Sequence, residues 1–473
     1  MEMVTIPKHE YEALKALVAA LAGELEEAKA KIKTLEAQLS KNSSNSNKPP
    51  SSDHPGKQVK NSRVKSGKCS GGQAGHEGRT KQPTATPDTV VKLEPQTECT
   101  CGGNVIIDND AYTVRQQEDL QPAKVIRAEY RAHDGKCDRC GKEYKADFPE
   151  GVEGPISYGP HLRGMIAYLN AYQLLPLKRT AEMVKHLYGI DISQGTIVNI
   201  MNEAYVNLLP VESRLKDEII RSDIVYFDES GMKVRARLYW IHSASTKECT
   251  VYLVHPKRGK DAMDEMGILP VFQGTAIHDH WKSYYHYLCA HAECNAHHLR
   301  HLQWLFEDLG YDWAGEMICL LLRIKRHVDL SRAFGADCLP QEAIDEYECA
   351  YRKILALAGE NESPHIESKR MVNRMTAYEQ ESLLFMYDFD VPFTNNLAER
   401  DIRMPKLKQK ISGGFRSEDG ADAFARIRGF VSTAIKRGKN VYDGLIAVFN
   451  GDAYDFMFSS SSNIYIISPS ANN

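Results

Sequence analysis

The clearest strand in the sequence is Asp223-Ile-Val-Tyr-Phe-Asp-Glu-Ser-Gly-Met-Lys-Val234. Residues 238–243 and 250–255 are also rich in β-branched and aromatic residues, and turn residues separate the three segments, so we expect three successive strands. A helix over residues 259–269 and a fourth strand over residues 274–281 are expected to follow. Three strands, a helix and a further strand predict an α/β domain built on a mixed sheet.

Two carboxylates stand where strands are expected to end. Asp228 follows the apolar residues 224–227 and precedes a Gly-containing turn, and Asp279 follows the apolar run 275–277. An acid at the tip of a buried strand is costly unless it is paired or metal-bound. Two such tips on neighbouring strands can place their oxygens on one hard cation. A turn or capping role is the default for either residue alone, and for the pair both interpretations stay open.

A third acid lies in residues 392–403, Pro-Phe-Thr-Asn-Asn-Leu-Ala-Glu-Arg-Asp-Ile-Arg. Thr394 or Asn395 is expected to cap a helix whose second turn presents Glu399. Residues 400–440 carry eleven Lys or Arg against four Asp or Glu, a net charge of +7. A carboxylate beside such a basic surface is typical of a metal-dependent enzyme that acts on a polyanion.

The N-terminal segment predicts a long helix. Apolar residues recur in steps of three and four over residues 11–39, which gives four heptads of an a/d seam. A short coiled coil that joins two chains is one interpretation, and an amphipathic helix lying on its own domain is the other. Residues 41–81 contain almost no large apolar residue and carry nine Lys or Arg against two acids, a net of +7. They predict a flexible basic segment, either a solvated linker or an arm that lies along phosphates.

Four cysteines within residues 97–149 have a spacing that suits a metal site. Cys99 and Cys101 are followed by two glycines, and Cys137 and Cys140 by one. The intervening segment could supply a short strand from Val125 to Tyr130. Two such knuckles can aim four thiolates at one tetrahedral Zn²⁺, and zinc removal would then unfold the module. The first pair has a one-residue spacing where two is usual, and buried free thiols are the alternative.

Residues 158–209 predict a group of helices. A helix over residues 180–189 ends at a glycine, and after a tight connection Ser193 is a natural N-cap for a second helix. This pattern is typical of a helix-turn-helix, in which Gln194 and Thr196 at the start of the second helix would contact DNA. A helical hairpin without a DNA role is the alternative.

The composition of the whole chain argues against several classes of protein. Lys and Arg total 59 against 63 Asp and Glu, and the net charge of −4 argues against a histone-like binder when it is read as one number. Eleven cysteines, an odd number, fit a reducing compartment better than a disulfide scaffold. No apolar run approaches the roughly 18 residues that a membrane span needs. The N-terminal segment lacks the basic start of a signal peptide, so we expect a cytoplasmic protein with no membrane partner.

Motifs along nearly the whole chain resemble those of the DDE transposases of the insertion-sequence-66 family. Besides the leucine-rich N-terminal helix and the four-cysteine module, they are Lys41-Asn-Ser-Ser-Asn-Ser-Asn-Lys-Pro-Pro-Ser-Ser-Asp53, Gly71-Gly-Gln-Ala-Gly-His76, Phe227-Asp-Glu-Ser-Gly231, Cys294-Asn-Ala-His-His-Leu-Arg300 and Asn395-Asn-Leu-Ala-Glu-Arg400. The chain departs from the family at Ser230, where Thr is usual. It departs again after Asp279, where His-Trp stands in place of Gly-Tyr.

The resemblance implies a ribonuclease-H-like catalytic core, to which the expected strand order is also similar. Asp228, Asp279 and Glu399 would be the catalytic acids and would hold two Mg²⁺ or Mn²⁺ ions for phosphodiester cleavage and strand transfer, with no covalent protein intermediate. One structural Zn²⁺ would lie on Cys99, Cys101, Cys137 and Cys140. The expected contacts with DNA, besides those from the helix-turn-helix, are Arg400, Arg403, Lys406, Lys410, Arg416, His297 and Arg300.

The segment between the second and third acids is longer than the core requires. It has 119 residues of largely helical composition, so we expect a helical insertion at about residues 300–390. Between the second and third acids, just before the expected insertion, Cys294 and His297 have a spacing that could ligate a metal ion. A packing Cys and a positioning His is the favoured interpretation, and His297 is also a candidate for contacting DNA phosphate.

The expected organisation has six parts. They are a coiled-coil helix (1–40), a flexible basic linker (41–90), a zinc-finger module (91–152), a helical DNA-binding region (153–220), the catalytic domain (221–450) and a C-terminal tail (451–473). A transposase of this kind would bind the terminal inverted repeats of its element and target DNA, would dimerise through residues 11–39 and could need accessory transposition proteins. The alternatives are a metal-dependent nuclease of the same fold that cuts without joining, and a zinc-containing DNA-binding regulator whose catalytic core has decayed.

Overall fold

The computed structural model describes residues 7–40, 82–120, 124–360 and 365–459, and for some residues of the first range it describes the backbone alone. Contacts divide the chain into two units, Met1–Val59 with Glu129–Asn473, and Lys60–Ala128, and each is considered by itself. The basic segment predicted at residues 41–81 lies outside the described residues. None of the helices in the described ranges is long and apolar enough to cross a membrane.

The N-terminal helix α1 spans Lys8–Ser40, as the heptad pattern predicts. Residues of its apolar seam are exposed, and Tyr11, Leu21 and Leu35 each expose slightly more than half of their surface. The helix is therefore confirmed, and its pairing with a second chain stays a prediction.

The cysteine region contains one small hairpin, whose strands are β1 (Asp134–Lys136) and β2 (Glu143–Lys145). The two strands pair antiparallel, with Gly135 opposite Tyr144. The strand predicted at residues 125–130 is wrong, because residues 124–133 form no strand. The pattern of β-branched residues there has no partner strand among the described residues, whereas the turn that carries the second cysteine pair closes the hairpin.

The central sheet has five strands in the order β5-β4-β3-β6-β7. Its elements, with the helix that links β5 to β6 and the 3₁₀ turn that precedes β7, are β3 (Ile224–Val234), β4 (Arg237–Ser245), β5 (Thr250–His255), α6 (Lys260–Met266), β6 (Thr275–His278), η3 (Tyr284–His286) and β7 (Ala290–Glu293). β3, β4 and β5 pair antiparallel, whereas β6 is parallel to both β3 and β7. The mixed sheet predicted from the sequence is confirmed.

The turn after β3 differs from the prediction. β3 continues through Gly231 to Val234, and the chain reverses at Arg235 and Ala236, whose φ angles of 48° and 61° are both positive. Positive φ at both central residues is the geometry of a tight type I′ hairpin, which suits the right-handed twist of paired strands. Asp228 therefore lies within a strand rather than at its end.

Helices from both ends of the chain cover one face of the sheet. They are α2 (Pro160–Ala167), the π-helical turn η2 (Tyr168–Tyr172), α3 (Leu177–Tyr188), α4 (Gln194–Asn207) and α5 (Leu209–Ile220) before the sheet, and α13 (Glu418–Lys436), α14 (Val441–Asn450) and α15 (Ala453–Phe458) after it. Their apolar residues share one core with Val225 and Phe227 of β3. The predicted turn between α3 and α4 is confirmed, because Gly189 has a φ of 64° and Ser193 Oγ accepts a hydrogen bond of 3.0 Å from Thr196 N.

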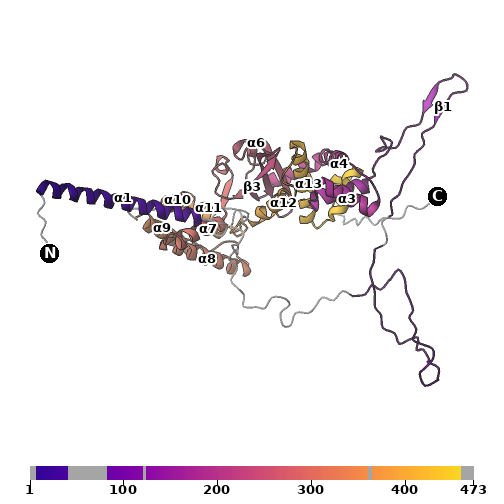
Figure 1. Ribbon diagram of the computed structural model, residues 1–473, viewed down its shortest axis with the longest axis horizontal. Helices are drawn as coiled ribbons and strands as arrows, with labels where there is room; N and C mark the ends of the chain where they lie inside the picture. Colours follow the sequence, from indigo (N-terminus) through magenta and orange to yellow (C-terminus); the bar gives the residue numbers. More distant parts are fainter. Residues whose placement is uncertain (1–6, 41–81, 121–123, 361–364, 460–473) are drawn as a thin grey trace. The chain divides into compact units, whose positions relative to one another are not determined.

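A second group of helices packs on the other face of the sheet. These helices are α7 (Asn295–Glu307), α8 (Asp312–Ala333), α9 (Gln341–Gly359), α10 (Ile366–Ala377) and α11 (Glu379–Tyr387), and Figure 1 shows them gathered beside the sheet. Their core includes Trp304 and Tyr351 and reaches Tyr226 and Ile277 of the sheet. They occupy the place of the predicted insertion and lead into α12 (Asn396–Ser412).

Candidate active site

The parallel pair β3 and β6 brings the first two predicted acids to the same level. Tyr226 pairs with Ile277 in this register, so Asp228 and Asp279, each two residues further on, occupy adjoining positions. Alternate residues of a strand point to the same side, which puts both carboxylates on one face. The expected juxtaposition of strand acids is thus present, with Asp279 immediately after the last residue of β6.

The start of α12 brings the third acid close to Asp228. Glu399 lies in the first turn of the helix, not in the second as predicted. The side chain of Asn395 makes no N-cap bond, contrary to expectation; its amide instead donates to Phe227 O at 2.7 Å. Asn395 N also donates to Cys294 Sγ at 3.1 Å. Asn395 therefore fixes the start of α12 to the residue that precedes Asp228, because both of its donors are used across the chain.

The three acids lie close enough to influence one another electrostatically. Burial and the charge of Glu229 hold the pKa of Asp228 well above its ordinary range, and the charges of Asp279 and Glu399 raise it further. Burial, followed by the charge of Glu229, raises the pKa of Asp279 to about 7, although Arg258 opposes the shift. Carboxylates that repel one another in a partly buried site are stabilised by a divalent cation, which favours their charged forms.

The donor set fits a hard cation at these acids. Glu399 Oε1 is buried and has no hydrogen-bond partner among the described residues, and Arg300 Nη2 is 3.9 Å away from it. An oxygen left in this state is available to a metal ion, and carboxylate oxygens are the ligands that Mg²⁺ and Mn²⁺ prefer. The three carboxylates do not form one of the described groups whose ligand atoms all lie within 4.8 Å, so a bridging ion would draw them together.

Glu229 is a buried acid beside Asp228 that the sequence analysis left without a role. It exposes 8% of its surface, and its Oε1 accepts from Arg258 Nε at 2.8 Å while its Oε2 accepts from Tyr284 OH at 2.5 Å. The guanidinium of Arg258 also lies over the rings of Trp240 and Trp281, 4.9 and 3.9 Å from their centroids. This acid is neutralised by Arg258 on one side, and its charge acts on Asp228 and Asp279. Only the Asp-Glu pair in β3 marks it in the sequence, because its partners lie far along the chain.

Cys294 and His297 lie beside Glu399, and one ligand atom from each of the three falls within 4.8 Å of the others. Burial raises the pKa of the Cys294 thiol to about 11, so it is a neutral thiol at pH 7 that accepts a hydrogen bond. Burial and the charge of Arg300 lower the pKa of His297 to about 3. A neutral Cys294 thiol and a neutral His297 ring fit the packing Cys and the positioning His favoured by the sequence analysis. Arg300 is then the positively charged side chain beside Glu399.

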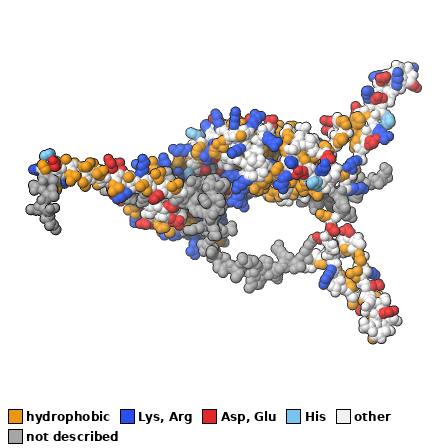
Figure 2. Space-filling model, in the orientation of Figure 1, with side chains coloured by type: hydrophobic (Ala, Val, Ile, Leu, Met, Phe, Trp, Pro, Cys, Tyr) orange, Lys and Arg blue, Asp and Glu red, His pale blue; other side chains and the backbone are white. Residues whose placement is uncertain are grey.

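The basic residues of segment 400–440 form two sets, one exposed and one that points inward. The predicted contacts belong to the exposed set. Arg400, Arg403, Lys406, Lys410 and Arg416 are all exposed. Because successive helical residues are about 100° apart, Arg403, Lys406 and Lys410 lie within about 60° of Glu399 on the same face of α12. Figure 2 shows Lys and Arg side chains gathered over the region that holds β3 and α6.

Other cations of the same segment point inward, so the net charge of +7 overstates the surface. The buried Lys408 donates to Asn170 O at 3.2 Å and to Leu175 O at 3.3 Å, which ties α12 to η2 and the segment that follows it. Arg426 and Arg437 pair with Glu212 and Glu218 of α5. These side chains hold helices together and are not available to a polyanion.

A part-buried ion pair anchors α12 behind its exposed face. Asp401 Oδ2 lies 2.7 Å from Lys436 Nζ and accepts from Ser245 Oγ at 2.7 Å. Pro405 lacks the N–H that would bond the carbonyl of Asp401, and Tyr252 OH donates to that carbonyl at 2.9 Å. The backbone group freed by the proline is therefore satisfied from the sheet, which fixes the helix that carries Glu399.

The two cysteine pairs each lie in a tight turn. Around the first, Cys99 N donates to Gly103 O at 2.8 Å; around the second, Cys137 N donates to Lys142 O at 2.8 Å. Hydrogen bonds from Cys101 lower the pKa of Cys99, and those from Cys140 lower the pKa of Cys137. Each turn thus favours a thiolate, as a zinc knuckle requires.

The predicted DNA-reading helix α4 is partly built into the core. Ile197, Ile200, Met201 and Ala204 are buried, whereas Gln194 at its start is exposed. The hydroxyl of Thr196 is 2.9 Å from Ser193 Oγ, so it belongs to the cap. Gln194 is therefore the freer of the two predicted contacts.

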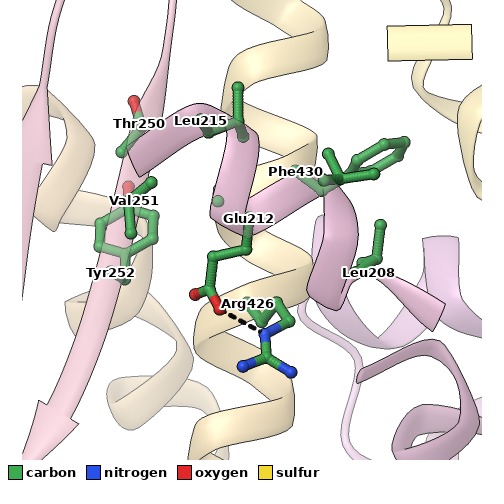
Figure 3. Close-up of a pocket in the computed structure, with 10 residues that line it drawn as sticks. Leu208, Glu212, Leu215, Thr250, Val251, Tyr252, Arg426 and Phe430 are labelled. Carbon is green, nitrogen blue, oxygen red and sulfur yellow. Dashed lines mark hydrogen bonds and ion pairs between the residues drawn. The ribbon is translucent and has the colours of Figure 1, made fainter. Parts of the chain in front are cut away.

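Two cavities among the described residues lie away from the acids. A cavity of about 10 Å³ is lined by Leu208 and by residues of α5, β5 and α13, where Arg426 pairs with Glu212 (Figure 3). That is room for about one water molecule. A larger hollow of about 660 Å³ lies among Tyr168, Tyr188 and Tyr442 of the helical region. Neither cavity is lined by any of the three acids.

Comparisons with known proteins identify the family to which the central part of the chain is similar. A family model described as Transposase IS66 family matches residues 155–423, which include all five strands of the central sheet and all three acids. A second model, described as a family of unknown function (DUF6444), matches residues 3–82. No curated protein matches the chain. Because the first match covers more than half of the chain, the chain belongs to the Transposase IS66 family.

Proposed function

We propose that this protein is a DDE transposase that cleaves the ends of an insertion sequence and joins them to target DNA. The observation that carries the proposal is the proximity of three acids beside the central sheet. Asp228 and Asp279 are level on parallel strands, and Asn395 ties the start of α12, which carries Glu399, to β3. The strand order β5-β4-β3-β6-β7, with the helical insertion between β7 and α12, supports a ribonuclease-H-like core.

Asp228, Asp279 and Glu399 would hold two Mg²⁺ or Mn²⁺ ions. Bound there, the ions supply a nucleophile, first from water and then from the freed 3′-hydroxyl, and stabilise the leaving oxygen. Asp228 lies level with Asp279 in the sheet and would be one of the ligands of these ions. Arg258 neutralises Glu229 through a hydrogen bond of 2.8 Å. The carboxylates of Asp228, Asp279 and Glu399 therefore carry the negative charge that recruits cations.

The path of the DNA is proposed from the exposed cations around Glu399. Arg403, Lys406 and Lys410 share its helix face, and Arg400, Arg416, Arg300 and Gln194 are further contacts. Phosphates neutralised by these side chains would lie beside the acids, because the helix face is common to both. Replacing Arg403 and Lys406 with Ala should lower the slope of log affinity against log salt by about 2. An unchanged slope would mean that DNA follows another face.

Further parts of the proposal concern assembly. The exposed apolar seam of α1 supports dimerisation through residues 11–39. The two cysteine turns support one Zn²⁺ held by Cys99, Cys101, Cys137 and Cys140. The basic segment 41–81, outside the described residues, would lie along phosphates, and accessory transposition proteins could take part. We place the protein in the cytoplasm.

The deciding experiment uses labelled duplexes from the ends of the element, a supercoiled target plasmid and Mg²⁺. Asp228→Asn, Asp279→Asn and Glu399→Gln should each bind the ends normally but neither cleave nor join them, since the amides keep the shape and remove the metal-binding charge. The exposed acid Asp217 offers a matched control as Asp217→Asn. Cleavage that persists in Asp228→Asn contradicts the proposed site.

Two other outcomes would favour the alternative functions. Cleavage without any joined product in the parent chain indicates a nuclease of the same fold. End binding without Mg²⁺-dependent cleavage indicates a regulator that has lost its chemistry.

A further inference from the structure

A second group of ligand side chains lies next to the acids and is not used by the chemistry proposed above. One nitrogen of His280, one nitrogen of His298 and one carboxylate oxygen of Glu293 all lie within 4.8 Å of one another. His280 follows Asp279 directly, Glu293 is the last residue of β7, and His298 lies in the first turn of α7. Three separate elements therefore converge on one point.

The group is buried and incompletely satisfied. Glu293 exposes 2% of its surface and His298 none. His280 Nδ1 and His298 Nδ1 are buried and have no hydrogen-bond partner in the described part of the chain. A buried imidazole nitrogen without a partner is costly in a folded protein, and metal coordination through His280 Nδ1 is one way to satisfy that nitrogen; His298 faces Glu293 with its other nitrogen, Nε2.

The carboxylate is already oriented by neighbouring side chains. Glu293 Oε1 accepts from Tyr285 OH at 2.7 Å, and Oε2 accepts from Ser382 Oγ at 3.4 Å and lies 2.6 Å from His298 Nε2. The rings of His280 and His298 stack with their centroids 5.4 Å apart. Hydrogen bonds to a ligand from residues outside the coordination sphere are typical of metal sites, because they fix its orientation.

We propose that His280, Glu293 and His298 form a site for a transition-metal ion of the zinc class. Two imidazoles and one carboxylate suit Zn²⁺, and related ions such as Co²⁺, better than Mg²⁺, which prefers oxygen ligands alone. Three protein ligands leave one position for water. The ion would replace the proton between His298 Nε2 and Glu293 Oε2, and these atoms would move apart by about 1 Å to reach tetrahedral spacing.

Charges around the group connect the ion to the neighbouring acid. The charge of Arg374, from α10, acts on His280, and the charges of Glu293 and Asp279 act on Arg374. A doubly charged ion beside this guanidinium would be opposed by the negative charges of both Glu293 and Asp279. Because His280 adjoins Asp279, the ion would also fix the backbone of that acid and fasten α7 to the sheet. The inference does not depend on the proposed transposition, since metal binding is measured directly.

The test measures the zinc content of the purified full-length chain by mass spectrometry after equilibration with Zn²⁺ and removal of the excess. Cys137→Ser with Cys140→Ser serves as the background, so that zinc on the cysteines does not enter the count. In this background we expect one equivalent of zinc, lost in His280→Ala and in Glu293→Gln. His291→Gln, on the same strand as Glu293 but outside the group, should retain it. Equal zinc in His280→Ala and its parent would overturn the proposal.

Two further readouts distinguish this site from zinc held by the catalytic acids and from a His–Glu pair that binds no metal. Co²⁺ in the same background should give visible bands without a thiolate charge-transfer band, and Zn²⁺ should raise the melting temperature of the parent but not of His280→Ala.

If Glu293→Gln does not fold, His280→Ala decides, because His280 is only half-buried. Asp228→Asn should keep its zinc, and loss of zinc in that variant would place the ion in the carboxylate site and overturn the proposal. Absence of zinc in every variant, the parent included, would also overturn it and would mean that the group is only a hydrogen-bonded His–Glu pair.

Discussion

Replacing Asp279 with Asn is expected to stabilise the metal-free protein while it removes activity. The pKa of this carboxyl is raised from 3.8 to about 7 by burial and by the charge of Glu229. Between pH 4 and pH 7 the folded chain therefore keeps a proton that the unfolded chain has released. The free energy of unfolding falls over this interval as the pH rises, and above pH 7 the full cost remains.

The size of the effect follows from the shift of the pKa. About three pKa units at about 1.36 kcal/mol each give roughly 4 kcal/mol as an upper value. Since the carboxyl is only half-buried, we expect Asp279→Asn to exceed the parent by about 2 to 4 kcal/mol at pH 8 and to equal it near pH 4. Urea denaturation in EDTA at the two pH values measures both differences.

A divalent cation should cancel most of this difference in stability. Mg²⁺ at 100 times its dissociation constant adds about 2.7 kcal/mol to a chain that binds it only when folded. The parent should gain this stability and Asp279→Asn should not, while the exposed control Asp217→Asn should behave like the parent. If Asp279→Asn is no more stable than the parent at pH 8 in EDTA, the electrostatic account of this acid is refuted.

Three further predictions concern how the site is held and assembled. Asn395→Ala removes the hydrogen bond to Phe227 O, so it should cost about 1 to 3 kcal/mol and slow single-turnover cleavage without weakening DNA binding; unchanged cleavage would contradict the positioning role. Asp401→Ala leaves the part-buried Lys436 amine without a counter-charge and should cost about 1.5 to 3 kcal/mol. Adding Lys436→Met should recover part of that loss, and additive losses in denaturation would count against the pair. Deletion of residues 1–40 should lower the mass in light scattering from dimer to monomer, and an unchanged mass would rule out pairing through α1.

The strands and helices were largely predictable because their signals are local. The strand predicted at residues 250–255 has those bounds in the structure, and the cap at Ser193 follows from its own residue type. Asn395 shows where local reasoning stops. Its type predicts a side-chain cap, but its amide bonds Phe227, which lies 168 residues earlier. A long-range partner of this kind leaves no mark in the neighbouring sequence.

The charged residues show the same limit more clearly. Lys406 and Lys408 are alike in sequence and two positions apart, yet they lie about 160° apart around the helix. The first is exposed and the second is buried against backbone carbonyls. Likewise, Glu229 adjoins Asp228 but is neutralised by Arg258, which the sequence does not reveal. Counting charges along the chain predicted where the candidate site lies, whereas only the fold separates the residues that hold this region together from those that are exposed.

The balance of charge around the three acids indicates when each of the two proposed Mg²⁺ or Mn²⁺ ions binds. Five carboxylates influence one another there, and three guanidinium groups oppose them. The carboxylates are Asp228, Glu229, Asp279, Glu293 and Glu399, and the guanidinium groups are those of Arg258, Arg300 and Arg374. When metal binding has ionised all five carboxylates and no ion lies on His280, Glu293 and His298, five negative and three positive charges leave two negative charges, which one divalent cation balances.

A second cation at the acids would therefore make the free site positive, and the phosphates of bound DNA supply the negative charge that it needs. We expect calorimetric titration with Mn²⁺ to find one ion at the acids in the free protein and two in its complex with element ends. The control is Asp228→Asn, which should lose both. Two ions bound with equal affinity in the absence of DNA would show that the local charge does not govern their entry.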